Sequence, residues 1–478
     1  MKKGQIIENL VVETMAAAGK CVSRIDGMVI FLEGGAPGDV VDAQVTKIKK
    51  SFLEGRVTAV RQFSEDRTEP FCRHFGLCGG CTWQHIQYDT QLRYKQQQVV
   101  DNLQRIGGLD LPAIRPILPS GKTKYYRNKL DFTFTAQRWL TFEELDIRRK
   151  RFPDNPWGED EPALGYHIPR KFDQVFEVQE CFLQTDPSNA IRHTVKEEAT
   201  KSNIPFFELR KQTGFLRTLT IRTANTGEVM IILQVADDKM EWIEKILGRL
   251  DRDFPEITSF NYVINAKKND TFSDLKITCW KGNPYITERM SKPDGSGSLQ
   301  FRIGPKSFYQ TNSDQAYALY KVAWEMAQLM GNELVYDLYT GTGTIANFMA
   351  GHASRVVGLE YIAAAIDDAR INAEINNITN TQFFAGDIKD LLDDAFLSLH
   401  GRPDTVITDP PRAGMHADVC AMLLKALPKK IVYVSCNPAT QARDLALLSD
   451  QYAITAVQPV DMFPHTIHVE NVVALQRR

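Results

Sequence analysis

Two residues suited to covalent and acid–base chemistry end neighbouring strand-like segments in the last third of the chain. Asp409 ends DTVITD and precedes two prolines, which stiffen the loop after it. Cys436 directly follows KIVYVS. An isolated cysteine is more often buried and inert, and only its thiolate is a good nucleophile. We interpret Cys436 as a nucleophile because a second reactive residue and a nucleotide-binding pattern are expected at the same edge.

The nucleotide-binding pattern is a glycine-rich turn after the strand-like segment ELVYDLY. Its glycines, Gly341 and Gly343, allow a tight turn and a close approach of a ligand. Glu360 ends the next strand-like segment, 19 residues after Gly341, where a carboxylate can accept hydrogen bonds from ribose hydroxyls. The turn also fits the dinucleotide pattern G-x-G-x-x-G/A, so a nicotinamide enzyme is an alternative. Asp387 either binds an adenine amino group or caps the helix after it.

Clustered cysteines indicate a second candidate site. Cys72, Cys78 and Cys81 have the spacing C-x5-C-x2-C, and Cys181 lies far downstream. Four thiolates suit zinc or a [4Fe–4S] cluster, and the spacing is compatible with both. Cys21, Cys279 and Cys420 are interpreted as core or incidental residues.

The reactive residues of the C-terminal region require a sheet that brings strand ends together. From about residue 306, strand-like and helix-like segments alternate five times. This alternation predicts a parallel, doubly wound sheet with its ligands at the carboxyl ends of the strands. The chain then ends in FPHTIHVE, where Glu470 and His465 are either a proton acceptor with its neighbour or surface residues of a terminal hairpin.

The preceding regions have a different pattern. Residues 1–62 hold short apolar runs separated by glycine-containing turns, which is typical of a small OB-like β-barrel. Residues 124–280 alternate strand-like segments with polar loops and predict an α+β region. We interpret the polar stretch 142–163 as an insertion or mobile loop. The expected domains are therefore 1–62, 63–305 and 306–478.

Composition narrows the class of protein. The chain has 478 residues, 43% hydrophobic and 24% charged, as in ordinary globular proteins. No run of 18 apolar residues is present, and the N-terminus turns polar before an apolar segment could form. We therefore expect a cytoplasmic protein with no membrane span.

Charge is unevenly distributed although the chain as a whole carries only −2. Residues 306–478 hold 13 basic and 19 acidic side chains, whereas residues 121–151 hold nine basic and four acidic ones. The basic stretch includes the aromatic residues Tyr125, Tyr126, Phe132 and Phe134, a mixture that suits phosphate contact and base stacking in single-stranded RNA. We predict Arg127 and Lys129 as phosphate contacts; the alternative is a solvated strand face with buried aromatics.

Several motifs together resemble one family. They are C-x5-C-x2-C, DLYTGTGT, DPPRAG, SCNPAT and FPHTIHVE. The chain resembles, over nearly its whole length, the TRAM-domain-bearing RNA (uracil-5-)-methyltransferases of the kind that modify 23S ribosomal RNA. DPPRAG followed by SCNPAT is the most specific part of the likeness, whereas the glycine loop alone is not specific.

The resemblance implies a multidomain α/β fold. This fold has an N-terminal OB-like barrel that is an RNA-binding TRAM module, a central α+β domain with an iron–sulfur site, and a C-terminal Rossmann-like class I methyltransferase domain. The helix expected over 84–106 packs on that last domain. RNA is the implied partner, most directly 23S ribosomal RNA, with transfer RNA as an alternative. No obligate protein partner and no membrane are implied.

The resemblance also assigns residues. It implies a [4Fe–4S] cluster on the four cysteines Cys72, Cys78, Cys81 and Cys181. It implies S-adenosylmethionine bound at the C-terminal sheet, where the candidate contacts are Gln310, Tyr339, Gly341, Thr344, Glu360, Asp387 and Asp409. Thr344 departs from the asparagine that many members have at this place. Cys436 is the implied nucleophile and Glu470 the implied base.

These residues suit one reaction. A thiolate that adds to carbon 6 of uracil makes carbon 5 electron-rich, which divides a difficult substitution into easier steps. Glu470 then removes the proton from carbon 5, and Asp409 orients the uracil or the methionine part of the cofactor. The target base must leave its stack to expose both faces. An iron–sulfur oxidoreductase that uses a dinucleotide is a more remote alternative.

Overall fold

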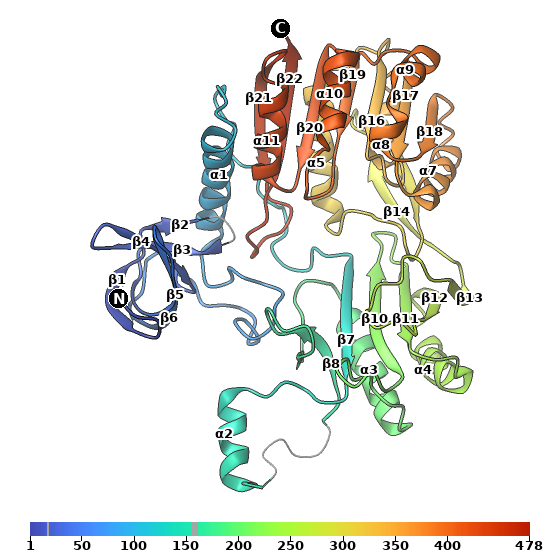
Figure 1. The fold of residues 1–478 in the computed structure, drawn as a ribbon. Coiled ribbons are helices and arrows are strands. Elements are labelled where there is room, and N and C mark those ends of the chain that lie inside the picture. Colours follow the sequence, from blue (N-terminus) through green and yellow to red (C-terminus); the bar gives the residue numbers. More distant parts are fainter. Residues whose placement is uncertain (17–18, 155–160) are drawn as a thin grey trace.

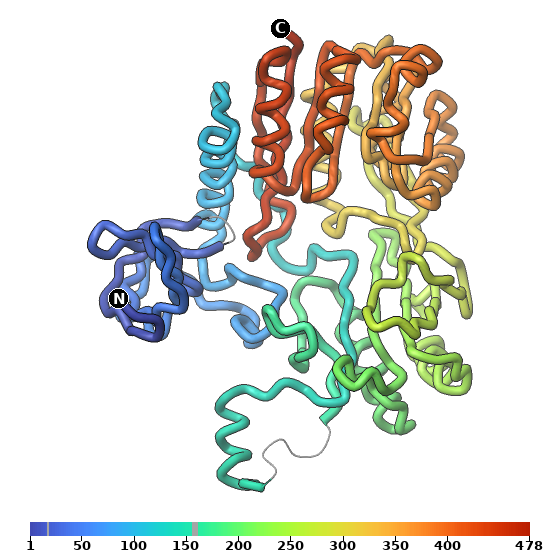
Figure 2. Tube along the Cα trace, viewed as in Figure 1, coloured from blue at the N-terminus to red at the C-terminus, as the bar shows by residue number. Residues whose placement is uncertain are grey.

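The computed structural model describes residues 1–16, 19–154 and 161–478. These residues form sheets of six, seven, two and seven strands. The chain runs from a small N-terminal β-unit through a central sheet to a large C-terminal sheet, and both views show these as three adjoining bodies (Figure 1, Figure 2).

The N-terminal sheet has the order β1-β5-β6-β4-β3-β2. Its pairs are antiparallel except for β4 with β6. Alternating side chains such as Ile30, Leu32 and Leu53 are fully buried, as expected for strands with one face on a core. The strands are β1 (Ile6–Val11), β2 (Thr14–Met15), β3 (Cys21–Ile25), β4 (Met28–Glu33), β5 (Val40–Ile48) and β6 (Phe52–Gln62).

A buried carboxylate connects this sheet to the chain that follows it. Asp39 is fully buried and accepts hydrogen bonds from the Ala36 and Ser64 amides and from both Nε and Nη2 of Arg67. Burial alone would raise the pKa of Asp39, but the hydrogen bonds from Arg67 and the two amides outweigh it and lower the pKa. The carboxylate therefore stays charged inside the protein.

The central sheet has the order β13-β12-β11-β10-β7-β8-β9. Its pairs are antiparallel except for β11 with β12. Every residue of β11 is buried, which explains its continuous apolar sequence VMIILQV. The strands are β7 (Lys129–Thr135), β8 (Ala163–His167), β9 (Val175–Glu177), β10 (Leu216–Thr223), β11 (Val229–Val235), β12 (Ile257–Ile264) and β13 (Ile277–Gly282).

Two helices, α3 (Ser188–Lys201) and α4 (Met240–Asp253), pack together beside this sheet. The buried residues of α4 recur at helical spacing, at Ile243, Ile246, Leu247 and Leu250. This spacing places one apolar stripe of the helix on the core.

The expectation of a loop over 142–163 is wrong in part. Residues 142–151 form helix α2 (Phe142–Arg151), which stands away from the central sheet (Figure 1). Its N-terminus has a capping box, in which Thr141 and Glu144 satisfy each other's backbone amides. Residues 155–160 of the same stretch lie outside the described residues.

The C-terminal sheet has the order β18-β17-β16-β19-β20-β22-β21. The first five strands are parallel, and β22 is antiparallel to both β20 and β21. The strand order reverses at β16, so the carboxyl ends of β16 and β19 form the crevice where ligands bind in such sheets. The strands are β16 (Leu334–Leu338), β17 (Arg355–Glu360), β18 (Thr381–Ala385), β19 (Thr405–Thr408), β20 (Lys430–Ser435), β21 (Tyr452–Val460) and β22 (Glu470–Arg477).

Helices connect the parallel strands, as the alternating sequence pattern predicts, and give this region a Rossmann-like fold (Figure 1). A two-stranded hairpin, β14 (Ile286–Ser291) with β15 (Ser298–Ile303), precedes them. The helices are α5 (Ser313–Ala327), α6 (Thr344–Ala350), α7 (Ala363–Ile375), α8 (Ile388–Leu391), α9 (Asp394–His400), α10 (Ala417–Ala426) and α11 (Pro438–Leu448).

One helix from the first part of the chain belongs structurally to the C-terminal sheet. Helix α1 (Tyr88–Arg105) packs against α11 and β21. Its residues Val99 and Leu103 are fully buried in the same apolar cluster as Tyr433 and Val473 of the C-terminal sheet. Segments more than 300 residues apart in sequence therefore share one core. Among the helices of the described residues, none has the length and apolarity needed to cross a membrane.

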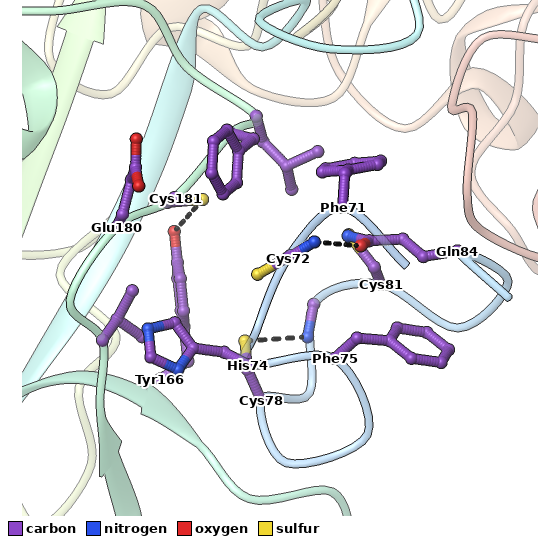
Figure 3. A pocket seen from close by; sticks show the side chains of 14 residues that line it. Phe71, Cys72, His74, Phe75, Cys78, Cys81, Gln84, Tyr166, Glu180 and Cys181 are labelled. Carbon is purple, nitrogen blue, oxygen red and sulfur yellow. Dashed lines mark hydrogen bonds between the residues drawn. The ribbon is translucent and has the colours of Figure 1, made fainter. Parts of the chain in front are cut away.

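The four clustered cysteines lie around one small cavity of about 30 Å³ between the chain near residue 75 and the central sheet (Figure 3). The Cys181 thiol faces the Tyr166 hydroxyl at 3.9 Å, and the Cys78 sulfur accepts a hydrogen bond from the Gly80 amide. Burial raises the pKa of Cys78 to about 12 and that of Cys81 to about 11. These side chains are therefore neutral thiols in this structure.

The iron–sulfur part of the expected fold class is wrong. Within residues 1–16, 19–154 and 161–478, no group of three or more His, Cys, Asp or Glu side chains is placed to hold a metal ion. The cavity has room for about two water molecules, since one needs roughly 10–15 Å³. In this arrangement the four cysteines do not fit an iron–sulfur cluster; they are Cys72, Cys78, Cys81 and Cys181. Their spacing in the sequence did not show how tightly their side chains pack.

The ion pair between Asp39 and Arg67 should contribute measurably to the stability of the N-terminal sheet. Changing Arg67→Met leaves a fully buried carboxylate without its counter-charge and should destabilise the sheet by about 3–5 kcal/mol. Hydrogen exchange of amides in β4 and β6 measures this loss. The matched control is Arg56→Met, because Arg56 is exposed and lies 3.8 Å from Glu33, so its loss should cost under about 1 kcal/mol. Equal effects of the two changes would contradict the assignment.

Candidate active site

Strand pairing brings Cys436 and Glu470 to the same edge of the sheet. Strands β20 and β22 are antiparallel, and their pairs run from Lys430 opposite Gln476 to Ser435 opposite Asn471. Cys436 directly follows Ser435, and Glu470 directly precedes Asn471, so both residues stand next to this last pair. The sequence suggested these two residues separately, and the sheet brings both to the carboxyl end of β20.

The thiol and two carboxyl groups share a buried environment. Burial, followed by the charges of Glu470 and Asp409, raises the pKa of Cys436 to about 11, while Arg412 opposes the shift. Burial and then Asp409 raise the pKa of Glu470 to about 8. Burial raises the pKa of Asp409 to about 7. At neutral pH the site therefore holds more protons than these groups would carry in water, and a cation that arrives beside them favours their ionised forms.

Arg412 and His468 complete the surroundings of the thiol, and neither was predicted as a functional residue. The Arg412 guanidinium favours the thiolate form of Cys436 and so opposes the rise of its pKa. Its Nη2 also lies 3.3 Å from Nδ1 of His468. Burial and then the charge of Arg412 lower the pKa of His468 to about 4, so the ring is neutral and accepts this contact. Arg412 lies in the motif DPPRAG and His468 in the motif FPHTIHVE, so these motifs could have pointed to both residues.

A tyrosine lies behind the carboxyl groups. Tyr320 of α5 is buried, which raises the pKa of its hydroxyl, and the nearby side chain of Gln310 opposes this shift. The charges of Asp409 and Glu470 both reach this hydroxyl. The carbonyl of Gln310 accepts a hydrogen bond of 3.0 Å from Asn128, a residue of the central region. Gln310 thus stands between the central region and the acid cluster, and sequence reasoning missed Tyr320 because its spacing is that of an ordinary core residue.

The glycine loop turns sharply beside this cluster. Tyr339 has φ 65° and Gly341 has φ 55°, and a positive φ in a residue as large as Tyr339 indicates local strain that often accompanies a functional site. A Cβ on Gly341 would meet no atom within 4 Å, so this position borders open space. A Cβ on Gly343 would lie 2.9 Å from the Ala369 Cβ, so the second glycine allows α6 to pack on α7.

Glu360 lies directly against the glycine loop. One carboxylate oxygen accepts a hydrogen bond of 3.2 Å from the Gly341 amide and the other accepts one of 3.0 Å from the Ile362 amide. The aromatic rings of Phe308 and Tyr361 flank this region and are 69% and 71% exposed. Large exposed rings beside a carboxylate and a glycine turn form a surface that suits a nucleoside.

Thr344 and Asp387 occupy helix N-termini. Thr344 is buried at the start of α6, with its hydroxyl 3.3 Å from that of Thr342. Asp387 is the N-cap of α8, where its carboxylate accepts a hydrogen bond of 3.2 Å from the Lys389 amide. The capping role considered for Asp387 is therefore present in the structure, and its contact with adenine stays a prediction.

The two predicted RNA contacts differ in their surroundings. The Arg127 guanidinium lies 5.2 Å from the Phe463 ring centre, and its buried Nε has no hydrogen-bond partner among the described residues. Its charge lowers the pKa of His468, so Arg127 belongs to the surroundings of that ring. Lys129 instead forms an ion pair of 3.1 Å with Asp131 on the same strand. The two residues thus have different partners, and their contact with RNA stays a prediction.

Comparison with known protein families gives two matches. Residues 2–58 match the TRAM domain, and residues 276–478 match the family described as tRNA (uracil-5-)-methyltransferase. The first match covers the N-terminal sheet, and the second contains the whole C-terminal sheet. Both agree with the family expected from the motifs.

Relatives and a solved structure extend over the whole chain. A protein of Bacteroides thetaiotaomicron, described as an uncharacterized RNA methyltransferase, is 53% identical over 467 residues, covering 97% of this chain and 100% of that protein. A protein of Porphyromonas gingivalis with the same description is 52% identical over 468 residues, covering 97% and 98%. The crystal structure of Pyrococcus abyssi tRNA (uracil-54, C5)-methyltransferase with S-adenosyl-L-homocysteine is 28% identical, with a TM-score of 0.73 and coverage of 97% of this chain and 99% of that one.

These likenesses confirm the expected enzyme class, an RNA methyltransferase, and favour methyl transfer over the nicotinamide alternative. They also confirm the N-terminal TRAM strands and the Rossmann-like methyltransferase fold at the C-terminus. The chain belongs to the TRAM-containing RNA methyltransferases of the uracil-5 family.

Proposed function

We propose that this enzyme transfers the methyl group of S-adenosylmethionine to carbon 5 of a uridine in RNA, with Cys436 as nucleophile and Glu470 as base. The observation that carries the proposal is the β20–β22 pairing, which ends with Ser435 opposite Asn471, because Cys436 and Glu470 are the residues next to that last pair at the ligand edge of the sheet. Burial and like charges at this position raise the pKa of both groups, as expected where proton transfer is part of a reaction.

The residues of this chain account for each change at the uracil ring. The Cys436 thiolate adds to carbon 6, and the electron pair of the 5,6 double bond moves to make carbon 5 nucleophilic. Arg412, whose positive charge favours the ionised thiol, stabilises the thiolate before this addition. Bound S-adenosylmethionine supplies an electrophilic methyl group for carbon 5. Ionised Glu470 then takes the proton from carbon 5, the double bond re-forms, and the Cys436 thiolate leaves.

The cofactor contacts proposed here follow the geometry of the strand ends. Glu360 is placed for the ribose hydroxyls, and the open space at Gly341 admits the nucleoside. Gln310 and Asp409 lie at the acid cluster, nearest the reacting centre. The remaining proposed contacts of S-adenosylmethionine are Tyr339, Thr344 and Asp387.

We propose 23S ribosomal RNA as the substrate. The TRAM match and the basic stretch 121–151, which includes Arg127 near His468, support an RNA-binding face beside the C-terminal sheet. Transfer RNA is the second candidate, because the solved relative with 97% coverage of this chain is described as a tRNA methyltransferase. The proposed domain limits remain 1–62, 63–305 and 306–478.

A methyl-transfer assay tests the function. The purified protein should transfer label from methyl-labelled S-adenosylmethionine to unmodified 23S ribosomal RNA, and digestion should recover the label as 5-methyluridine. Mapping by mass then locates the uridine. Label found only in transfer RNA would replace the proposed substrate by the second candidate. No label in either RNA, with a folded protein that binds the cofactor product, would overturn the proposed reaction.

Replacing the nucleophile should separate chemistry from binding. Cys436→Ala should lower turnover by more than about 10³-fold, because no other group can add to carbon 6. The affinity for S-adenosylhomocysteine, measured by calorimetry, should stay within about twofold. RNA containing 5-fluorouridine should form a covalent adduct with the wild-type protein and none with the variant, since fluorine at carbon 5 cannot leave as a proton.

The matched control for this change is Cys279→Ala. Cys279 is a partly exposed cysteine of β13, outside the proposed site, so its loss should leave turnover and adduct formation unchanged. Near-normal turnover of Cys436→Ala, or adduct formation that depends on Cys279, would remove the assignment of the nucleophile.

The raised pKa values predict the direction of the pH dependence. Glu470 acts as a base only when ionised, and its pKa is about 8, so kcat/KM should rise by about tenfold per pH unit from pH 6 towards pH 8. Glu470→Gln should remove this inflection and lower kcat by about 10²–10⁴-fold. Rates measured with RNA well below KM test the first statement and rates at saturating RNA test the second, both in buffers of constant ionic strength. A profile that is flat from pH 6 to pH 8 would contradict the role of Glu470.

A further inference from the structure

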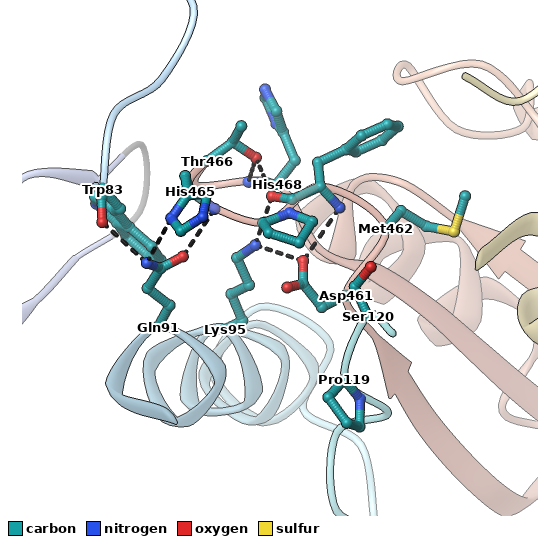
Figure 4. Close-up of polar contacts among 12 residues, drawn as sticks. Trp83, Gln91, Lys95, Pro119, Ser120, Asp461, Met462, His465, Thr466 and His468 are labelled. Carbon is teal, nitrogen blue, oxygen red and sulfur yellow. Dashed lines mark hydrogen bonds and ion pairs between the residues drawn. The ribbon is translucent and has the colours of Figure 1, made fainter. Parts of the chain in front are cut away.

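The segment 461–469 joins β21 to Glu470, the first residue of β22, and is held from outside at four consecutive carbonyls. A different hydrogen-bond donor meets each carbonyl: Met462 O from Asn312 Nδ2, Phe463 O from Lys95 Nζ, Pro464 O from the Tyr126 hydroxyl, and His465 O from the Thr82 and Trp83 amides. A backbone stretch without regular structure is therefore satisfied by donors far away in the sequence (Figure 4).

Helix α1 supplies the strongest of these contacts. Lys95 and Asp461 are both fully buried, and the Lys95 Nζ lies 2.6 Å from the Asp461 Oδ1. The second carboxylate oxygen of Asp461 accepts a hydrogen bond of 2.8 Å from the Tyr88 hydroxyl. Lys95 cannot contact RNA because none of its side chain is exposed, so any effect of this residue on the reaction must pass through the segment that it holds.

Gln91, one turn earlier on α1, holds the same segment at His465. Its side-chain oxygen accepts a hydrogen bond of 2.8 Å from the His465 amide, and its nitrogen lies 3.2 Å from the His465 ring. The same nitrogen donates to the Trp83 carbonyl at 2.9 Å. His465 has φ 63°, a backbone conformation that is unfavourable for a non-glycine residue and needs such contacts to persist.

The held segment leads directly into the proposed catalytic groups. Three residues after His465, His468 contacts Arg412, whose charge acts on the Cys436 thiol. Two residues further, Glu470 begins the strand that pairs with β20, which ends directly before Cys436. A shift of the segment would therefore move His468 and the start of β22 together.

We propose that Lys95 and Gln91 of α1 are positioning residues that hold segment 461–469 so that Arg412 and Glu470 meet the Cys436 thiol in reactive geometry. The inference rests on the proposed roles of Cys436 and Glu470. It assigns to a helix from the first quarter of the chain a part in the chemistry of the last quarter. A misplacement of about 1 Å in a catalytic group can lower a rate by about 10²-fold.

Lys95→Met tests the proposal, since it keeps the length of the side chain and removes its charge and hydrogen bonds. We expect kcat to fall by about 10- to 100-fold and the 5-fluorouridine adduct to form more slowly by a similar factor. KM for RNA and the affinity for S-adenosylhomocysteine should stay within about threefold. Hydrogen exchange should become faster at the amides of residues 463–468, a readout that does not depend on activity.

A second variant separates positioning from general damage to the fold. Lys95→Met leaves Asp461 buried without its counter-charge, and adding Asp461→Asn removes that charge. The double variant should recover thermal stability. Its kcat should recover in proportion to the return of slow hydrogen exchange at the amides of residues 463–468. Recovery of stability and of slow exchange without any recovery of kcat would overturn the proposal.

Arg217→Met is the matched control. Arg217 is a nearly fully buried side chain of β10 whose guanidinium pairs with Asp270 at 2.9 Å, away from the segment. Its loss should lower stability while kcat of the folded protein remains unchanged. If Lys95→Met behaves like this control, with lower stability but normal kcat, the proposal fails while the proposed function stands. If the wild-type protein itself methylates no RNA, the proposed function fails instead.

Discussion

The antiparallel pairing of β20 with β22 is the constraint on which the candidate site depends. In the parallel part of the C-terminal sheet, the side chains available to a ligand lie at the carboxyl ends of the strands, where the connections to the helices begin. The reversed strand β22 begins at that same edge, so its first residue, Glu470, lies next to the last β20–β22 pair, as Cys436 does. A shift of one residue in this register would turn Glu470 to the other face of the sheet. The proposed nucleophile and the proposed base therefore meet at one edge because β22 is antiparallel to its neighbours.

Burial gives the pair its chemical character. The thiol and the carboxyl groups of Glu470 and Asp409 lie where water is scarce, and the pKa of each is raised. Arg412 is the charge that opposes this effect on both Cys436 and Glu470. A site arranged in this way holds its protons until a positive group is bound, and a sulfonium is such a group. The same arrangement keeps a reactive thiol in its neutral form when the enzyme is empty.

Domains drawn along the sequence do not coincide with the units that pack together in the structure. Helix α1 precedes the central sheet in the chain but shares its core with the C-terminal sheet. Through Lys95 and Gln91 it also holds the segment that leads into Glu470. The central region contributes Asn128 to Gln310 and Arg127 to the surroundings of His468. The active site is thus built jointly by segments that a linear reading assigns to separate units.

Local patterns were enough to infer the family and the Rossmann-like sheet, and to select Cys436, Glu470, Asp409 and Glu360 as candidates, because strand–helix alternation and short motifs each lie within one or two elements. Three features depended on the tertiary structure. The β20–β22 pairing and the contact of Lys95 with Asp461 both join segments that are far apart in the sequence, so no local pattern predicts either one. Whether the four clustered cysteines can hold a metal depended on the volume and the burial around them. The spacing of cysteines along a chain gives information on neither of these.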